Sequence, residues 1–231
     1  MIYMPMKGDG STALAEIDRF DGGVGWVAYP NETMQRASHA LDTDEGLWLV
    51  DPVDADSLDE LLAEFGEVAG VVVCLDRHKR DAAQIARRHD VSVHIPRWMS
   101  NVASKIDAPI ERVDGQLSGT DYELFEIRNS SVPPWQEAGL YNPDTGTLVV
   151  PESVGTASYF TVESERLGVH PMLRMVPPRK TLGRFTPERV LVGHGAGVLD
   201  DAADALAAAL AGSKRNTLSL YGKTAKQFLT P

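Results

Sequence analysis

The chain has 231 residues, 43% of them hydrophobic, and a formal net charge of −11 at pH 7. This length and composition are ordinary for a soluble globular protein and predict one domain over residues 1–231 with a sizeable core. The negative charge argues against binding to nucleic acid or to anionic membranes, because both would be repelled.

Cysteine content and apolar runs indicate the compartment. Cys74 is the only cysteine, which excludes an intrachain disulfide and a cysteine-rich zinc site. Residues 1–10 lack the apolar core of a signal peptide, so none is expected. The longest apolar run, Val68–Leu75, is strand-sized and far shorter than the roughly 20 residues of a membrane helix. We therefore expect an acidic protein of the reducing cytoplasm, with no membrane partner.

The first half of the chain predicts strands that alternate with helices. Apolar alternation indicates a strand at Val24–Tyr29, and Val68–Leu75 is apolar throughout, as is typical of a strand buried on both faces. Leucines recur at helical spacing from Leu58 until Gly66. The expected elements are strands over 24–29, 38–41, 46–51, 68–75 and 91–95, with helices over 58–65 and 79–88.

The second half predicts mostly strands and one late helix. A hairpin is expected around the turn that ends at Gly146, and an alanine-rich helix is expected to stop near Gly212. The expected elements are strands within 116–127 and over 140–141, 147–150 and 189–192, with a helix over 199–210. Two packed sheets with helices on both outer faces accommodate this order.

Four local sequences carry a family resemblance. Gly46–Pro52 is a strand that ends in an aspartate before a helix. Val71–Pro96 contains a strand, a charged loop, a helix and a strand. Val190–Gly195 is a strand that ends in a glycine-flanked histidine, and Thr147–Glu152 is a further strand that ends in an acid. In this order, over about residues 24–211, the chain resembles the metallo-β-lactamase superfamily. The resemblance implies an α/β fold, an αββα four-layer sandwich of two mixed sheets flanked by helices.

The metal-binding loop of that family reads His-x-His-x-Asp-His, and this chain departs from it. Without a gap, the last histidine falls on His78, and the other three positions hold Val73, Leu75 and Arg77. Sliding the alignment by two residues places Asp76, His78, Arg80 and Asp81 on the four ligand positions. In both alignments one histidine remains.

The other ligand positions of the family are altered to different degrees. The middle histidine of the family is missing from residues 130–135, and Glu152 stands for the bridging aspartate. His194 keeps its setting between glycines. The resemblance therefore implies at most one zinc, iron or manganese ion, held by His78, Glu152 and His194, with Asp76 or Asp81 as a fourth ligand. It would make the protein a metal-dependent hydrolase of a small anionic ester, thioester or lactone.

The interpretation that we prefer from sequence is a degenerate member without metal, either non-catalytic or binding a small ligand. Arg77, Lys79 and Arg80 occupy the loop that should receive a dication. An arginine has a fixed positive charge and five donors. It could take the place of the ion and pair with Asp76, Asp81 or Glu152.

Residues 166–187 contain no acid although the whole chain is acidic. Their basic residues are Arg166, Arg174, Arg179, Lys180 and Arg184. One hypothesis is that Arg174, Arg179, Lys180 and Arg184, together with Arg77 and Arg80, bind a small anionic molecule. The alternative is a solvated loop or a subunit contact, and apolar residues 159–160 and 172–173 could support a homodimer.

The remaining histidines and the cysteine are expected to have structural roles. His39 and His94 lie on expected strands. His170 precedes a proline in a loop and could face the site, but we expect it to be exposed. Cys74 lies within an apolar strand, so we expect an inert thiol whose pKa burial raises.

Overall fold

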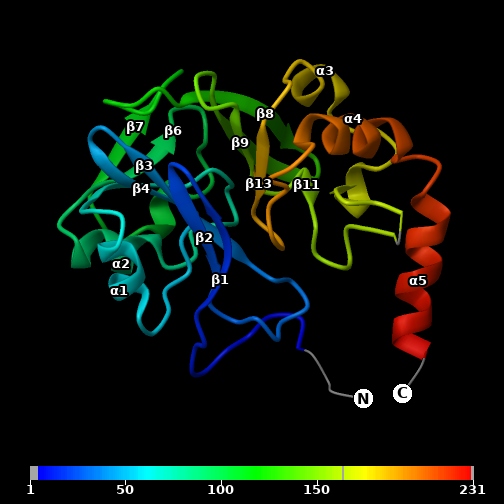
Figure 1. The fold of residues 1–231 in the computed structure, drawn as a ribbon, viewed down its shortest axis with the longest axis horizontal. Helices are drawn as coiled ribbons and strands as arrows, with labels where there is room; N and C mark the ends of the chain where they lie inside the picture. Colours follow the sequence, from blue (N-terminus) through cyan, green and yellow to red (C-terminus); the bar gives the residue numbers. More distant parts are fainter. Residues whose placement is uncertain (1–4, 163, 230–231) are drawn as a thin grey trace.

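A computed structural model describes residues 5–162 and 164–229 and contains two large β-sheets flanked by helices, with a third sheet of two strands (Figure 1). Residues 1–4, part of the segment for which no signal peptide is expected, lie outside the described residues. Within the described part of the chain, every helix is too short or too polar to cross a membrane.

The N-terminal half forms a seven-stranded sheet in the order β1-β2-β3-β4-β5-β6-β7. Strands β1 to β4 pair antiparallel, and β4 to β7 pair parallel. The strands are β1 (Ala15–Phe20), β2 (Gly23–Val27), β3 (Ala37–Thr43), β4 (Gly46–Val50), β5 (Val68–Val72), β6 (Val93–Pro96) and β7 (Ile110–Val113). Parallel neighbours need crossover connections. Helices α1 (Leu58–Ala63) and α2 (Ala82–Arg88) form part of two crossovers, and a 3-10 helix, η1 (Ala103–Lys105), lies in a third.

The C-terminal half forms a four-stranded sheet in the order β13-β10-β9-β8, in which β10 and β13 are parallel. Its strands are β8 (Glu123–Ser131), β9 (Pro134–Asn142), β10 (Thr147–Val150) and β13 (Arg189–Val192). Between β10 and β13 in the sequence, β11 (Val154–Gly155) and β12 (Gly168–Val169) form a separate two-stranded sheet. The helices are η2 (Pro171–Leu173), α3 (Arg179–Leu182), α4 (Ala202–Gly212) and α5 (Thr217–Leu229).

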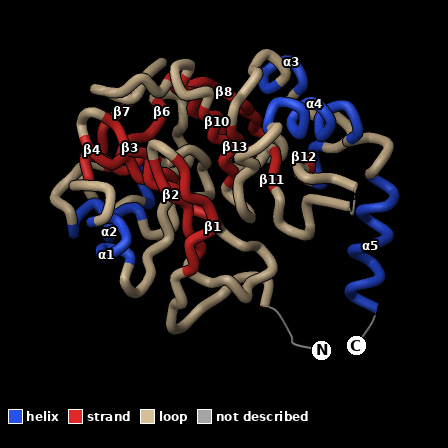
Figure 2. The backbone as a smooth tube through the Cα atoms, in the orientation of Figure 1, coloured by secondary structure: helices blue, strands red, loops and turns tan. Residues whose placement is uncertain are grey.

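Three apolar clusters define four layers. The middle cluster joins the two sheets, with Trp48 and Cys74 from the first and Leu140 and Leu191 from the second. A second cluster packs α1 and α2 on the outer face of the first sheet, and a third packs α4 on the outer face of the second. Figure 2 shows the helices outside the strands. The predicted αββα sandwich is confirmed.

The expected elements differ from the observed ones at functional positions. The helix predicted to begin at residue 79 begins at Ala82, because Arg80 adopts a left-handed backbone with φ 37° that a helix does not allow. The strand predicted to reach Leu75 ends at Val72, and Leu75 then bridges across to Glu137 of the other sheet. Eight elements were not predicted: the strands β1, β7, β11 and β12 and the helices η1, η2, α3 and α5.

Candidate metal centre

Four strand ends meet at one edge of the sandwich. Asp51 follows β4 and His78 lies in the loop after β5, and these strands are parallel neighbours. Glu152 follows β10 and His194 follows β13, which are parallel neighbours in the other sheet. Because parallel strands end at the same edge of a sheet, each sheet brings two of these side chains together.

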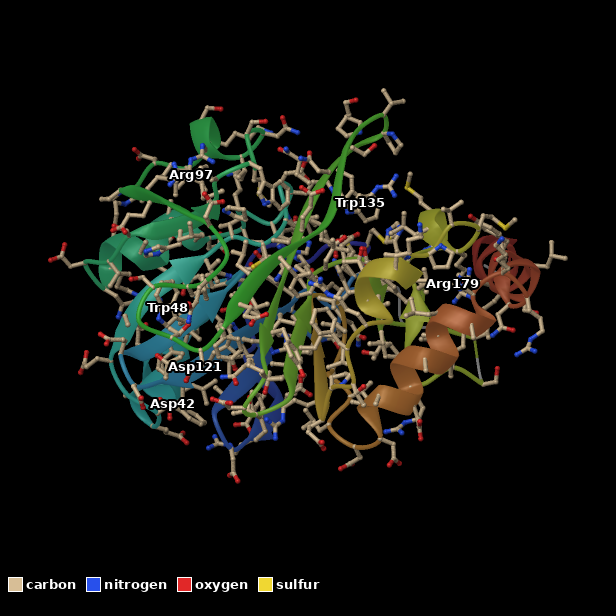
Figure 3. All side chains as sticks on the ribbon, turned by 90° about the horizontal axis from the view of Figure 1, so that it is seen from above. Asp42, Trp48, Arg97, Asp121, Trp135 and Arg179 are labelled. Atoms are coloured by element: carbon tan, nitrogen blue, oxygen red, sulfur yellow. The ribbon has the colours of Figure 1, made fainter. Side chains whose placement is uncertain are left out.

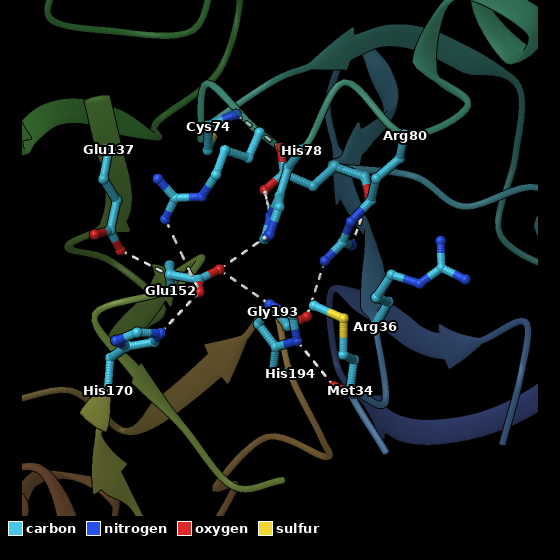
Figure 4. A network of polar contacts seen from close by, with 12 residues as sticks. Met34, Arg36, Cys74, His78, Arg80, Glu137, Glu152, His170, Gly193 and His194 are labelled. Atoms are coloured by element: carbon cyan, nitrogen blue, oxygen red, sulfur yellow. Dashed lines mark hydrogen bonds and ion pairs between the residues drawn. The ribbon is translucent and has the colours of Figure 1, made fainter. Parts of the chain in front are cut away.

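Three histidines surround the buried carboxylate of Glu152 (Figure 4). The Nε2 atoms of His78 and His194 lie 3.2 and 3.0 Å from Glu152 Oε2. The Nε2 atom of His170 lies 3.2 Å from the second oxygen, Oε1. The prediction that His170 is exposed was wrong, since only 13% of its side chain is accessible. Its only sequence signal was a histidine before a proline, in a loop whose path local sequence does not determine.

Hydrogen bonds fix the orientation of two of these rings. His194 Nδ1 lies 2.8 Å from the carbonyl oxygen of Met34, and His78 Nδ1 lies 2.9 Å from Asp51 Oδ2. A carbonyl oxygen only accepts, so Nδ1 of His194 carries the hydrogen, and the Asp51 carboxylate favours the same tautomer in His78. In the neutral rings, both Nε2 lone pairs then point at one carboxylate oxygen. Two such lone pairs repel the carboxylate oxygen unless a proton or a metal ion lies between them.

Burial and neighbouring charges set the protonation of the cluster. Burial lowers the pKa of His194, although the contact with Glu152 opposes this shift. Burial alone would raise the pKa of Glu152, but hydrogen bonds from the surrounding imidazoles, when their Nε2 atoms carry hydrogen, hold that pKa well below its usual range. A neutral His194 beside an ionised Glu152 is the protonation pattern of metal ligands.

The spacing of the donor atoms fits a metal ion. One ligand atom from each of His78, Glu152 and His194 lies within 4.8 Å of the others. Ligands at the bond lengths usual for tetrahedral zinc lie about 3.3 Å from one another. The two nitrogen–oxygen distances of 3.2 and 3.0 Å are close to this value. The donor set therefore fits one ion of the kind that imidazole and carboxylate bind.

Residues behind the cluster hold its ligands in place. Asp51 has φ 46°, and its Oδ1 accepts a hydrogen bond from the amide of Cys74 at 2.8 Å while Oδ2 faces His78. The fully buried Glu137 accepts hydrogen bonds from the amides of Glu152 and Ser153 at 2.9 and 2.7 Å. The sequence marks Asp51 as a strand end but carries no signal for a site role of either acid. Such outer contacts orient ligands and tune their basicity.

Glycines flank His194 for steric reasons. A Cβ at Gly193 would lie 2.1 Å from the carbonyl oxygen of Pro151, and Gly195 has φ +89°. Both positions therefore need glycine for the turn that presents the His194 ring.

Neither arginine of the loop takes the place of an ion between the ligands. Arg80 donates to the carbonyl oxygens of Ala37, Asp51 and Gly193, and so ties the strand ends of both sheets. The guanidinium of Arg77 lies on the ring of Trp135, 4.5 Å from its centroid, and its side chain is 43% exposed.

The predicted pairs of these arginines with acids are loose or missing. Arg77 lies 3.5 Å from Asp76 and 4.0 Å from Glu152, and within the described chain Arg80 forms no ion pair. Asp81 Oδ2 accepts a hydrogen bond from the amide of Asp54 instead. Neither Asp76 nor Asp81 joins the three-residue cluster as the predicted fourth ligand.

A cavity of about 290 Å³ opens over the cluster and is rich in positive charge. Its basic lining residues are Lys7, Arg36, Arg77, Lys79 and Arg80, and its acids are Asp81 and Glu152. We call it the metal-centre cavity. Arg36 is paired with Glu32 at 2.8 Å, so the exposed rim charge comes mainly from the lysines and Arg77.

The basic segment over residues 166–187 does not converge on this cavity. Arg174 is fully buried and pairs with Glu165 at 2.6 Å, which satisfies its charge inside the protein. Arg184 lies over the ring of Phe185. Arg179 and Lys180 line a different cavity. Of the six predicted anion-binding residues, Arg77 and Arg80 line the metal-centre cavity.

The other histidines and the cysteine have structural contacts. His39 Nε2 lies 2.9 Å from the Val192 carbonyl oxygen, and the His94 ring packs on Trp48 with centroids 4.6 Å apart. Cys74 is buried between the sheets, and this burial raises the pKa of its thiol. Such a thiol stays protonated and unreactive near neutral pH.

Comparison with solved structures identifies the fold. DIM-1 metallo-β-lactamase has a TM-score of 0.61 and 13% identity, over 91% of this chain and 99% of that chain. A metallo-β-lactamase from Pontibacter korlensis has a TM-score of 0.63 and 13% identity, over 87% and 99%. Rubredoxin oxygen:oxidoreductase from Desulfovibrio gigas has a TM-score of 0.62 and 14% identity, over 88% and 62%.

Sequence comparison alone gives no such relation. No protein-family model matches the chain, and no curated protein matches it. The agreement in structure over most of the chain is nevertheless clear, and the chain has the metallo-β-lactamase fold.

Proposed function

We propose that this chain binds one divalent metal ion through His78, Glu152 and His194 and is a hydrolase of a small anionic substrate. The observation that carries the proposal is the pair of Nε2 atoms, 3.2 and 3.0 Å from one carboxylate oxygen, on rings whose Nδ1 atoms already contact acceptors. A neutral imidazole, so held, has only its Nε2 lone pair to offer, and a metal ion satisfies both rings at once.

The identity of the ion follows from the donors. Imidazole and carboxylate suit zinc, iron and manganese, and the nearest alternative donor is His170, which already faces Glu152 Oε1. When bound, such an ion supplies Lewis acidity toward a carbonyl oxygen and toward water.

A second ion has no donors at the positions that the family resemblance assigns to it. Val73 and Leu75 are fully buried apolar side chains there, and Arg77 brings a positive charge. The proposal is therefore a degenerate member of this fold with one metal ion rather than two.

The lining of the metal-centre cavity supports the substrate class. Lys79 and Arg77 at the rim attract an anionic group, and a volume of about 290 Å³ suits a small molecule. Arg80 holds the strand ends that carry Asp51 and Gly193, so its role is to position the ligand loops. A small ester, thioester or lactone with a carboxylate fits this site.

A non-catalytic protein that binds a small anion is the second candidate. The observation that favours it is Arg77, which stands where the ungapped alignment has the aspartate of the family's loop and lies 4.0 Å from Glu152. A cation at this position weakens attraction for a dication and strengthens it for an anion.

Metal content separates the two candidates. Purified protein, reconstituted with zinc, iron or manganese and freed of excess metal, should contain one ion per chain by elemental analysis. His194→Ala should lose it, whereas the control His89→Ala, which alters a histidine paired with Asp59, should keep it. No retained metal in the wild type would contradict the metal site and favour the second candidate.

Catalysis needs its own test. The metal-loaded wild type should hydrolyse a nitrophenyl ester of succinate faster than the neutral acetate ester, and His194→Ala should not. A metal-loaded protein inactive on a panel of anionic esters, thioesters and lactones would support binding without catalysis.

A further inference from the structure

A second basic cavity, of about 430 Å³, opens beside Ser153, the neighbour of Glu152 in the chain. Its wall comes from β8, from the segment after η2 and from the turn after α4. Four of its lining residues are cations, Arg128, Arg179, Lys180 and Lys214, and none of the lining residues is acidic. We call it the distal basic cavity. Two basic residues of the segment 166–187 that lie outside the metal-centre cavity, Arg179 and Lys180, line the distal basic cavity.

The charges of the distal basic cavity have no internal compensation. In residues 5–162 and 164–229, no carboxylate forms an ion pair with any of its four cations. This differs from the buried Arg174 nearby, whose guanidinium is matched by Glu165. Four like charges around one cavity repel each other, in a chain whose net charge is −11. Binding of an anion would relieve that repulsion.

One donor of the cavity is also left without a partner inside the protein. The Nε atom of Arg128 is buried and forms no hydrogen bond with the described residues. Its guanidinium lies 5.8 Å from the centroid of the Trp135 ring, so the side chain is held by packing rather than by an acid. A buried donor without an acceptor is costly, and the Arg128 guanidinium has no internal carboxylate that a ligand would have to displace.

The remaining wall is apolar. Ile127 and Leu173 are buried at its base, whereas Met175 and Val176 are 58% and 77% exposed. Pro177 and Pro178 stiffen the same segment. A bare inorganic anion would leave this apolar surface in water, but an anion with an apolar body would cover it.

We propose that the distal basic cavity binds a small organic anion that combines a doubly charged group, such as a phosphate monoester, with an apolar body. Guanidinium groups match the oxygens of phosphate in paired hydrogen bonds, and lysines add charge at the rim. This site is separate from the metal-centre cavity and does not depend on metal binding.

Calorimetric titration with 1-naphthyl phosphate at low salt tests the proposal. Arg179→Gln/Lys180→Gln should weaken binding about tenfold or more, because two charge-assisted contacts are lost. The control Arg97→Gln/Lys105→Gln makes the same change in net charge, and Arg97 lies at the opposite end of the molecule from Arg179 (Figure 3). The control should change the affinity less than about twofold, as expected for distant, screened charges.

Two further measurements locate the binding site. Lys79→Gln, at the rim of the metal-centre cavity, should leave the affinity for 1-naphthyl phosphate unchanged. Inorganic phosphate should bind more weakly than 1-naphthyl phosphate, because it leaves the apolar wall uncovered. No binding by the wild type, equal losses in both double variants, or a loss only in Lys79→Gln would each overturn the proposal.

Discussion

The resemblance to metallo-β-lactamases, aligned without a gap, assigns two groups of positions to metal ligands, and these two halves differ in this structure. The half with His78, Glu152 and His194 keeps its donor atoms together at 3.0 to 3.2 Å, each ring held from behind by a second contact. The other half has Val73 and Leu75, both fully buried among apolar neighbours. We call the first the retained half and the second the lost half. Both halves lie on the same sandwich, so the fold does not depend on the complete set of ligands.

The side chains that stabilise the fold are therefore different from those that could bind a metal ion. Side chains in the lost half now belong to the hydrophobic core, where polar ligands would be costly. Side chains in the retained half are polar, buried and mutually oriented, which contributes little to stability unless an ion is bound. Substitutions in the lost half should therefore change the free energy of unfolding, and substitutions in the retained half should change the affinity for metal.

The largest effect on stability is expected in the lost half. Leu75→Ala should lower the free energy of unfolding by about 2–5 kcal/mol, because it removes a fully buried side chain from the core cluster that includes Trp135 and Val150. Urea unfolding measures this change. Leu218→Ala, at an 85% exposed position, is the control and should change it by less than about 0.5 kcal/mol. A loss for Leu75→Ala as small as the control's would show that the position is not part of a packed core.

A smaller effect, on metal affinity, is expected behind the retained half. Asp51→Asn should weaken metal binding about 10- to 100-fold. The amide keeps an oxygen for the amide of Cys74 but presents a donor to His78 Nδ1, which favours the tautomer with the hydrogen on Nε2. Competition with a chelating dye measures the affinity. Asp59→Asn changes an exposed carboxylate that also contacts a histidine, and should leave the affinity unchanged. Equal affinities for Asp51→Asn and wild type would contradict the role of Asp51.

The smallest effect is expected at the rim of the metal-centre cavity. Lys79→Gln should raise the KM for a succinate ester about two- to fivefold and leave kcat unchanged, because an exposed charge attracts the anion without touching the reacting bond. Steady-state rates at low and high salt measure this effect, which should shrink as salt screens the charge. A fall in kcat alone would place Lys79 in the chemistry instead.

The sandwich is predictable from the sequence because the signals for its strands and helices are local and repeated. The apolar run at Val68–Leu75 and the hairpin that turns at Gly146 specify strands wherever they occur. The resemblance implies His194 as a ligand, since its flanking glycines match the family and permit a tight turn at a strand end. The fold brings His194, His78 and Glu152 together.

The missed features depend on long-range packing. His170 reaches Glu152 because β12, which precedes it, pairs with β11 just after Glu152, and this pairing joins segments that are distant in sequence. Arg80 was expected to pair with an acid, but its left-handed φ of 37° turns the side chain onto three carbonyl oxygens. Residues 159–160 and 172–173 were expected to support a dimer, yet Phe160 and Leu173 are buried and Met172 is 62% exposed. The oligomeric state remains a prediction.

Anomalous diffraction from crystals of metal-loaded protein, recorded at the absorption edge of the bound metal, tests the central claim most directly. We predict one anomalous peak per chain, within bonding distance of His78 Nε2, His194 Nε2 and the Glu152 carboxylate. Two peaks per chain, or a fully loaded crystal with no peak among these three side chains, would contradict a single metal ion at this site.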